Sequence, residues 1–475
     1  MLIDIVCPES ITGSNNYSSE PPLGIVALFS SLPENYRKNV RILDATIMSQ
    51  VEIEKEVEER KAGIVALSCI TYNYSNALRI AKIAKTNGAF VVCGGIHITH
   101  RRDAILNKMQ KGERAIDFLV TGYGEPTLSP LITSLINGLP FDAIPNLSYI
   151  KDGQIVINHL DNRKSGADPL DKPLDYSKTD FVKYSSYFIP QGNLKNVKMV
   201  GSTYTQRGCP YIGDKKCTFC SIEHLNLWRS AELFEQDLTS LVSQYNIDHV
   251  RITDANFTVS VKRMNEIADV ANRVFDKTGI RPVFHCFARA DEINHQTADI
   301  LQRLNVVSLM VGYEAGSDRM LKSMNKNITK DENIQATQLL KNYGIEVIVG
   351  GLVLGVEGES ETTLLETIGF INEIQKINNT NTIMATPLIP LPGSTCFNQL
   401  LEKLKQEDLT KYIELNAEDN FNLEELIELW NYYFCKASLF RIIEVCEQVE
   451  KILPIGIRLI DLKGKIHEQG TACNN

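Results

Sequence analysis

Short apolar runs alternate with longer amphipathic segments in the first part of the chain. The runs have the continuous hydrophobic character of buried strands, and they occupy residues 2–7, 39–45, 62–70, 89–95 and 116–122. Between the third and fourth runs, Ala77, Ile80 and Ala84 recur at helical spacing, and Gly88 follows where a helix would end. Buried strands separated by helices predict a parallel, doubly wound α/β sheet in residues 1–145.

The predicted strands of this first domain end in small and polar residues. In a doubly wound sheet, ligands bind beyond the carboxyl ends of the strands. The residues at these ends are therefore candidates for cofactor binding: Ser68, Cys69, Gly94, Gly95, Gly122, Gly124 and Glu125. The alternative is that the glycines serve only to form tight turns.

A β-hairpin and a linker are predicted in residues 146–195. The hairpin covers residues 147–158, where Asp152-Gly153 is a typical two-residue turn. The segment 161–180 is polar and contains two prolines, which is typical of a linker.

The alternation of strands and helices resumes in residues 196–395. Apolar runs at 197–205, 249–255, 282–288, 306–314, 346–355 and 382–390 predict a partial (β/α)6 barrel with parallel strands. Barrel enzymes build their sites beyond the carboxyl ends of these strands. Asp254, Arg289, Glu314 and Gly355 stand at such ends and are candidate site residues. Residues 396–475 are amphipathic and predict a small helical region with a polar tail.

Composition and charge exclude several classes of protein. The chain has 475 residues, 43% hydrophobic and 23% charged, as expected of a globular protein with two or three domains. Its formal net charge of −9, without a long basic run, argues against nucleic-acid binding. The N-terminus does not form a secretory signal, and no apolar run reaches the ~20 residues of a membrane span. We therefore expect a cytoplasmic protein.

Three of the eleven cysteines, Cys209, Cys217 and Cys220, lie within twelve residues. In a chain without a secretion signal this pattern favours metal ligation over disulfides. With His224 the cysteines form a Cys3His set that suits structural zinc. Alternatively, the three cysteines alone hold an iron–sulfur cluster and leave one iron open. The cysteines follow the first barrel strand, where an active site belongs, and this location favours the cluster.

The cysteine loop resembles the cluster loop of radical S-adenosylmethionine (SAM) enzymes. That loop usually reads Cys-x3-Cys-x2-Cys, with an aromatic residue before the last cysteine. Here Phe219 occupies the aromatic position, and the gap between Cys217 and Cys220 is kept. The first gap holds seven residues, PYIGDKK, in place of three, and Gly213-Asp214 offers a turn that lets the extra residues bulge outward.

Other barrel segments resemble the same family in the same order: 287–293, 311–326, 344–367 and 387–395. One family feature is altered, because Pro-Gly-Glu after the fifth strand reads Glu357-Gly358-Glu359. The resemblance implies that the three cysteines ligate a [4Fe–4S] cluster whose open iron chelates SAM. It implies that Glu314 contacts the SAM amine or ribose. For Asp254 and Arg289, a structural salt bridge and a ligand contact are equally compatible with the sequence.

The first domain resembles the cobalamin-binding domain that precedes many radical SAM barrels. The resemblance lies in residues 21–28, 42–45, 65–74, 91–99 and 116–128, although Tyr123 replaces a glutamate of the usual Gly-Glu-Gly-Glu. No histidine follows the Asp-x-His-x-x-Gly pattern that ligates cobalt, so cobalamin without a histidine ligand is implied. We expect His97 and His100 to be polar loop residues. A domain that keeps this fold and binds no cobalamin is the alternative.

The sequence therefore predicts a cobalamin-dependent radical SAM enzyme, similar to the class B methyltransferases, that methylates an unactivated carbon. In this chemistry a 5′-deoxyadenosyl radical abstracts hydrogen from the substrate and methylcobalamin delivers the methyl group. A small molecule or peptide is the expected substrate, and an external donor such as flavodoxin or ferredoxin supplies the electron. The alternatives are a radical rearrangement, ring contraction or carbon–carbon bond formation without methyl transfer, and a zinc-stabilised binding protein without catalysis.

Overall fold

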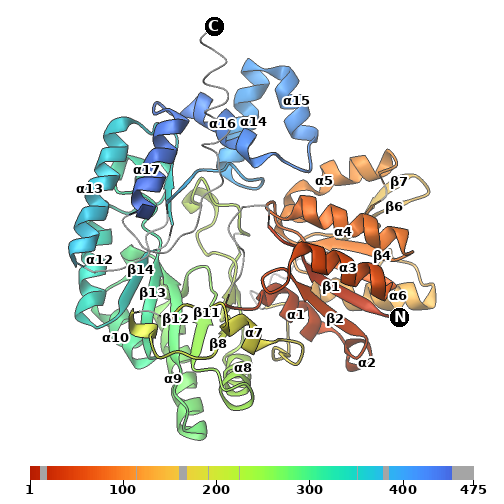
Figure 1. The fold of residues 1–475 in the computed structure, drawn as a ribbon, viewed down its shortest axis with the longest axis horizontal. Coiled ribbons are helices and arrows are strands. Elements are labelled where there is room, and N and C mark those ends of the chain that lie inside the picture. Colours follow the sequence, from red (N-terminus) through yellow and green to blue (C-terminus); the bar gives the residue numbers. More distant parts are fainter. Residues whose placement is uncertain are drawn as a thin grey trace. The chain divides into compact units, whose positions relative to one another are not determined.

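The computed structural model describes residues 1–10, 19–113, 115–159, 168–190, 192–223, 225–349, 351–377 and 385–451 (Figure 1). The chain divides into two compact units. The first contains residues 1–188, 228–233 and 410–421, and the second contains 189–227, 234–409 and 422–475. Two short segments that lie far along the chain thus belong to the first unit.

The first unit is built on a seven-stranded sheet with the order β2-β1-β3-β4-β5-β6-β7. The first five strands are parallel and confirm the predicted doubly wound sheet. The strands are β1 Ile3–Cys7, β2 Val40–Asp44, β3 Ile64–Ser68, β4 Phe90–Gly94, β5 Phe118–Val120, β6 Leu147–Lys151 and β7 Gln154–Ile157.

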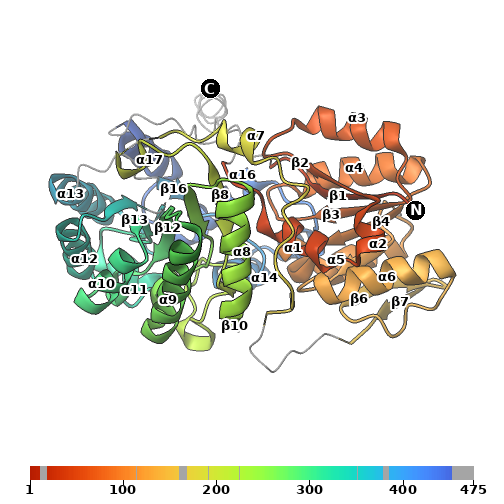
Figure 2. The same cartoon turned by 90° about the horizontal axis from the view of Figure 1, so that it is seen from below.

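Helices cover both faces of this sheet, each through its own apolar core. Ile53, Ala77 and Ile105 from α3, α4 and α5 belong to one core, whereas Ile25 and Leu131 from α1 and α6 belong to the other. Figure 2 shows α3 and α4 on one side of the strands and α6 on the other. The helices of this unit's first 188 residues are α1 Leu23–Ser31, α2 Glu34–Arg37, α3 Gln50–Arg60, α4 Tyr74–Thr86, α5 Ile96–Gln110, α6 Glu125–Asn137 and α7 Phe181–Ser185.

The predicted hairpin forms β6 and β7, which extend the sheet in antiparallel fashion from β5. Asp152 and Gly153 both have positive φ, 52° and 77°, as the predicted two-residue turn requires. The beginning of the predicted linker, residues 161–167, lies outside the described residues.

The second unit contains the predicted barrel strands. Five parallel strands form a sheet in the order β14-β13-β12-β11-β8, and β15 pairs with β16. The run at 346–355, predicted as one strand, forms β14 and β15 on either side of position 350, which is outside the described residues. The strands found between residues 196 and 395 are β8 Val200–Thr203, β9 Gln206–Arg207, β10 Leu227–Trp228, β11 His249–Ile252, β12 Val283–Ala288, β13 Val306–Val311, β14 Glu346–Val349, β15 Leu352–Leu354 and β16 Ala385–Pro387.

Helices follow the barrel strands and continue into the C-terminal region, as predicted. Among the described residues, no helix is long and apolar enough to cross a membrane. The α-helices are α8 Ala231–Gln244, α9 Val261–Thr278, α10 His295–Arg303, α11 Asp318–Ser323, α12 Lys330–Asn342, α13 Glu361–Ile377, α14 Thr395–Glu407, α15 Leu409–Ala417, α16 Leu423–Phe434 and α17 Leu439–Lys451. The 3-10 turns are η1 Gly192–Leu194, η2 Gly213–Lys215, η3 Phe257–Val259 and η4 Ala290–Glu292.

Asp4 on β1 is a fully buried carboxylate that joins three elements of the first unit. It accepts hydrogen bonds from Arg41 on β2, at 3.0 and 3.1 Å, and from Arg60 at the end of α3. We expect Asp4→Ala to lower the free energy of unfolding by about 1–3 kcal/mol, because two partly buried guanidinium groups lose their acceptor. Urea unfolding of the full chain measures this change.

Glu56→Ala is the matched control for this prediction. Glu56 pairs with the same Arg41, but its side chain is 46% exposed, so its loss is expected to cost below about 1 kcal/mol. Equal destabilisation by the two variants would contradict the role assigned to Asp4.

Candidate functional site

The cysteine loop is closed at its base by backbone contacts. Cys209 N–H donates to the Glu223 carbonyl at 3.1 Å. Gly208 before it has a φ of 78°, and a Cβ there would lie 2.3 Å from the Leu225 carbonyl oxygen. Only glycine permits this approach, so the two ends of the loop are held together.

The three cysteine side chains are half-buried, carry free thiols and interact electrostatically with one another. Burial raises the pKa of all three thiols, and that of Cys220 to about 11. The positive charges of Arg289 and Lys326 act against this rise at Cys209 and Cys217. Soft thiolates beside cations fit an iron–sulfur cluster, which requires deprotonated cysteines.

The three thiols do not by themselves form a complete site for a single ion. Among the described residues, no group of three His, Cys, Asp or Glu side chains is placed to hold one metal ion. His224, the fourth ligand of the zinc alternative, lies outside the described residues. A four-iron cluster binds each thiolate through a different iron, so the thiols need to surround a volume instead of a point.

The second half of the loop is bonded to the rest of the barrel. Thr218 N–H donates to the Met324 carbonyl at 2.9 Å, and Asn325 Nδ2 donates to the Lys216 carbonyl at 2.9 Å. Lys216 Nζ in turn donates to the Gly393 carbonyl at 2.7 Å. The segment after α11 and the turn before α14 thereby fix the position of Cys217.

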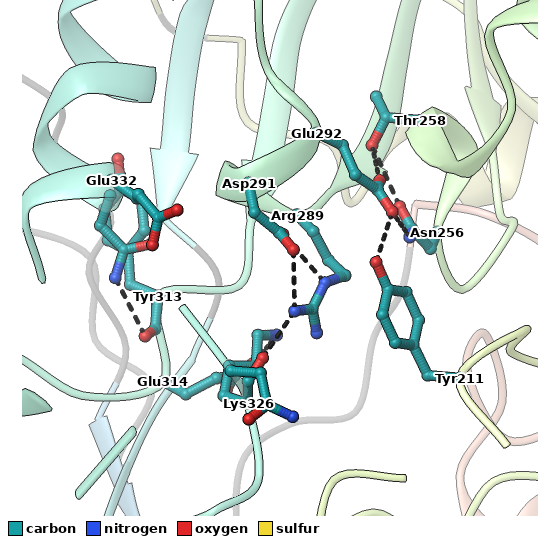
Figure 3. A network of polar contacts seen from close by, with 12 residues as sticks. Tyr211, Asn256, Thr258, Arg289, Asp291, Glu292, Tyr313, Glu314, Lys326 and Glu332 are labelled. Atoms are coloured by element: carbon teal, nitrogen blue, oxygen red, sulfur yellow. Dashed lines mark hydrogen bonds and ion pairs between the residues drawn. The ribbon is translucent and has the colours of Figure 1, made fainter. Parts of the chain in front are cut away.

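The longer first gap is held by Tyr211, which the sequence analysis did not single out. Its hydroxyl donates to Glu292 Oε1 at 2.8 Å, and its ring lies 4.1 Å from the Arg289 guanidinium carbon (Figure 3). Asn256 and Thr258 donate to the same Glu292 carboxylate, at 2.9 and 2.6 Å. The extra residues turn outward at η2, where the predicted turn residue Gly213 has a φ of 61°.

Arg289 extends from the end of β12 and is 6% exposed. Its Nε and Nη2 donate to Asp291 at 3.0 and 3.2 Å, and Nη2 also donates to the Lys326 carbonyl at 2.6 Å (Figure 3). The structural salt bridge considered for Arg289 therefore exists, with Asp291 as partner.

Glu314 follows β13 in a left-handed conformation with a φ of 62°. Its Oε1 accepts a hydrogen bond from Lys326 Nζ at 3.0 Å, and both side chains are largely buried. Its carbonyl accepts from Val353 N–H at 2.8 Å, which links the end of β13 to β15. The carboxylate thus lies at the barrel mouth beside a cation.

Asp254 joins the carboxyl ends of β8 and β11. Its carboxylate accepts from Thr205 N–H at 2.6 Å, from Gln206 N–H at 3.1 Å and from the Thr205 hydroxyl. Asp254 is fully buried, and this burial raises its pKa to about 6. No salt bridge of Asp254 is found among the described residues, and its contacts are those of a group that positions the backbone before the cysteine loop.

Gly355 and Phe219 are the last two residues predicted to bind a cofactor in the barrel. Gly355 has a φ of 83°, and its carbonyl accepts from Trp430 Nε1 at 2.8 Å, so α16 covers this turn. Its N–H donates to Glu359 Oε2 at 3.1 Å, and Glu359 is the buried carboxylate of the altered Glu-Gly-Glu segment. Phe219 is half-buried within the cysteine loop.

In the first unit, the ends of β3 and β4 are bonded to each other. Cys69 N–H donates to the Gly94 carbonyl at 2.8 Å, and His97 N–H donates to the Cys69 carbonyl at 3.2 Å. Gly95 has a φ of 104°, and a Cβ there would lie 2.5 Å from the Cys69 carbonyl oxygen. Ser68 pairs with Gly94 in the same register. These predicted cofactor-binding residues therefore form one continuous edge.

The residues after β5 lie next in this sheet. Gly122 N–H donates to the Thr99 hydroxyl of α5 at 2.9 Å, with a φ of 74°. Gly124 precedes α6, and Glu125 is the buried first residue of that helix. A Cβ on Gly124 would approach Leu28 to 3.1 Å.

The prediction that His97 and His100 are polar loop residues is wrong. Both lie in α5, and His97 is 1% exposed. Its Nδ1 is 3.1 Å from the Thr71 hydroxyl, and its Nε2 is 2.7 Å from the Asp419 carbonyl oxygen. Burial lowers its pKa to about 4.

Several residues of the site carry no sequence signal of their own. Tyr211 stands inside an irregular gap, and Glu292 and Lys326 stand in family-like segments whose motif residues draw attention first. A search for aromatic residues within the gap would have found Tyr211, since rings often pack on guanidinium groups.

Comparisons with known proteins identify the families of two domains in this chain. The family model of the radical SAM superfamily matches residues 203–371, and that of the B12 binding domain matches residues 10–132. An uncharacterized methyltransferase of Pyrococcus horikoshii is 27% identical over 86% of this chain and 86% of its own length. An anaerobic magnesium-protoporphyrin IX monomethyl ester cyclase of Rubrivivax gelatinosus is 25% identical over 82% of this chain and 68% of its own.

Among solved structures, the fold is similar to that of TsrM from Kitasatospora setae, a radical S-adenosylmethionine methyltransferase with cobalamin and a [4Fe-4S] cluster bound. The TM-score is 0.64 at 18% identity, over 85% of this chain and 75% of TsrM. The predicted cofactors, cobalamin, SAM and a [4Fe–4S] cluster, are confirmed at the level of the two domains that use them. With a B12 binding domain in its first unit and a radical SAM domain in its second, the chain belongs to the radical SAM enzymes that contain a cobalamin-binding domain.

Proposed function

We propose that this protein is a cobalamin-dependent radical SAM methyltransferase that methylates an unactivated carbon of a small molecule. The observation that carries the proposal is the loop of three half-buried thiols beside the carboxyl ends of parallel barrel strands, in a chain that also has a B12 binding domain. When bound, the cluster and SAM supply a 5′-deoxyadenosyl radical, and methylcobalamin supplies the methyl group.

Cys209, Cys217 and Cys220 are the proposed cluster ligands. Arg289 and Lys326 lower the cost of keeping Cys209 and Cys217 deprotonated, because their positive charges lie within electrostatic reach of these two half-buried thiols. Tyr211, between Cys209 and Cys217, and Thr218, between Cys217 and Cys220, position the loop through their bonds to Glu292 and to the Met324 carbonyl. The chain thus supplies three ligands and leaves SAM to complete the site.

Glu314 is the proposed contact for the SAM amine or ribose. Its carboxylate already accepts one hydrogen bond, from Lys326, and a carboxylate has room for several more donors. The loops after β3, β4 and β5 are the proposed cobalamin-binding edge of the first unit, and the last two contain the closely packed Gly95 and Gly124.

The substrate is proposed to be a small molecule, and an external protein donor to supply the electron. TsrM has been solved with a tryptophan substrate, which supports a small substrate for this fold. A second candidate is a cobalamin-dependent cyclisation without methyl transfer, favoured by the similarity to the magnesium-protoporphyrin cyclases.

One experiment separates these functions. The reconstituted protein is incubated anaerobically with a reductant, cobalamin and SAM that carries a deuterated methyl group. Formation of 5′-deoxyadenosine together with a deuterated methyl group on cobalamin supports the methyltransferase. 5′-Deoxyadenosine without labelled methylcobalamin favours the cyclisation, and the absence of both contradicts the radical SAM proposal.

For the cluster, we expect alanine at Cys209, Cys217 or Cys220 to abolish iron binding and SAM cleavage, since two thiolates cannot hold a four-iron cluster with one iron open. Iron analysis after anaerobic reconstitution measures the loss. Cys286→Ala and Cys396→Ala are matched controls, because both thiols are buried outside the loop, and His224→Ala should also keep its iron. Loss of metal from His224→Ala as complete as from the cysteine variants would support the zinc site instead.

For SAM, we expect Glu314→Ala to weaken binding about tenfold or more, since a hydrogen bond to a charged group contributes about 1.5–3 kcal/mol. Equilibrium dialysis of the cluster-loaded protein measures the affinity, with iron content as the check on folding. Glu332→Ala, on the exposed start of α12, is the control and should bind SAM normally. An unchanged affinity in Glu314→Ala would mean that this carboxylate serves only Lys326.

For cobalamin, we expect Gly94→Val to lose the cofactor while the barrel still cleaves SAM. A Cβ on Gly94 would meet Val120 at 3.6 Å, an ordinary contact, so the sheet tolerates it better than a Cβ on Gly95. The bound cofactor of the unmodified protein should show a base-off spectrum, because no histidine of the chain follows the Asp-x-His-x-x-Gly pattern and His97 is buried and bonded to the Asp419 carbonyl. Full cobalamin binding by Gly94→Val would rule out close approach at this edge.

A further inference from the structure

A segment far along the chain is built into the first unit. Residues 410–421, which we name the clasp, include most of α15 and lie in sequence between α14 and α16. Those two helices belong to the second unit, whereas the clasp belongs to the first. The described chain therefore leaves the second unit at residue 409, packs on the first, and returns at residue 422.

Arg101 of α5 is the main polar contact of the clasp. It is 7% exposed, and its Nη2 donates to the carbonyls of Asn416, at 2.8 Å, and Glu418, with a longer contact of 3.5 Å to Leu415. These carbonyls lie at and just beyond the C-terminal end of α15, where backbone acceptors lack helical partners and a cation is favourable. Its guanidinium carbon also lies 5.1 Å from the centre of the Phe421 ring.

Lys108, two turns further along α5, pairs with the clasp carboxylates. Its Nζ lies 3.1 Å from Glu418 Oε1 and also bonds Asp419. Asp419 is 5% exposed, and its second oxygen accepts from the Tyr74 hydroxyl of α4 at 3.1 Å. One buried carboxylate thus connects α4, α5 and the clasp.

His97 connects the clasp to the proposed cobalamin-binding edge, which is formed by the loops after β3, β4 and β5. Its ring bonds the Asp419 carbonyl and the Thr71 hydroxyl, and it packs on Tyr74 with ring centres 4.3 Å apart. The same residue's N–H donates to the Cys69 carbonyl, next to the close approach of Gly95. The clasp therefore fixes His97, which joins the first turn of α5 to Cys69 at the end of β3.

We propose that the clasp is a positioning element for cobalamin: it holds His97 and the first turn of α5 so that the loops after β3 and β4 keep the shape that the cofactor requires. This inference rests on the proposed cobalamin binding. Because the clasp is continuous with helices of the second unit, it also makes the shape of this edge depend on a segment that follows the radical SAM domain. Residues 1–188, the continuous N-terminal part of the first unit, therefore do not contain every segment that this unit needs, because the clasp lies far along the chain.

The test compares Arg101→Ala with Arg102→Ala in the full chain. Arg102 is the neighbouring cation and pairs with Asp103. We expect Arg101→Ala to weaken aquocobalamin binding about tenfold or more. The substitution removes the hydrogen bonds from a charged donor that hold the clasp on α5, and the clasp in turn holds His97 beside the proposed cobalamin-binding edge. Hydrogen exchange in cobalamin-free protein should rise in residues 96–110 and 410–421, while iron content and SAM cleavage stay unchanged. Arg101→Lys should restore part of the affinity, and Arg102→Ala should behave as the unmodified protein.

Equal cobalamin affinity in Arg101→Ala and Arg102→Ala would overturn the inference and leave the proposed function intact. Raised exchange in the clasp without a change in affinity would also overturn it, because the clasp would then serve stability alone. An unmodified protein that binds no cobalamin would contradict the proposed function and remove the positioning role with it. The spectrum of bound cobalamin offers a second readout, since a displaced edge should change the environment of the cofactor as well as its affinity.

Discussion

The Arg289 guanidinium is the interaction on which the candidate site depends. It is buried at the end of β12, bonded to Asp291 and to the Lys326 carbonyl, and covered by the Tyr211 ring. Through these partners one side chain connects the cysteine loop, the turn after β12 and the segment after α11. Its charge also opposes the effect of burial on two of the thiols. The Arg289 side chain therefore affects both the position of the cysteine loop and the pKa of its thiols.

The fold was largely predictable because most residues of its parallel strands are buried on both faces of the sheets. Continuous apolar runs with glycine or polar residues at their ends identify such strands without any knowledge of their partners. The exception is the run at 346–355, whose hydrophobic pattern does not reveal that β14 pairs with β13 while β15 pairs with β16. Pairing is a property of the whole sheet, and Glu314, 38 positions before Leu352, makes the bridge that joins β15 to the end of β13.

The site was predictable only where its residues are close in sequence. The spacing of Cys209, Cys217 and Cys220 is local, so a pattern identifies it. The contacts of Tyr211 with Glu292 and of Arg101 with Glu418 span 81 and 317 positions, and no local pattern encodes them. His97 shows the same limit, since a histidine after Gly-Gly suggests a loop until the segment that buries it is known. The role of such a polar residue depends on which segments, distant in sequence, bury it and bond it.

The seven-residue gap shows why family spacing is a weaker constraint than loop anchoring. Lengthening a flexible gap from three to seven residues costs about 0.7 kcal/mol of closure entropy at the usual logarithmic dependence on length. A single hydrogen bond to a charged group contributes about 1.5–3 kcal/mol, and Tyr211 makes such a bond to Glu292 while its ring covers Arg289. The contacts of the inserted residues therefore more than offset the cost of the insertion. What a cluster loop of this kind has to conserve is the position of its thiols, and a longer loop can achieve this when one of its added side chains is itself bonded to the barrel.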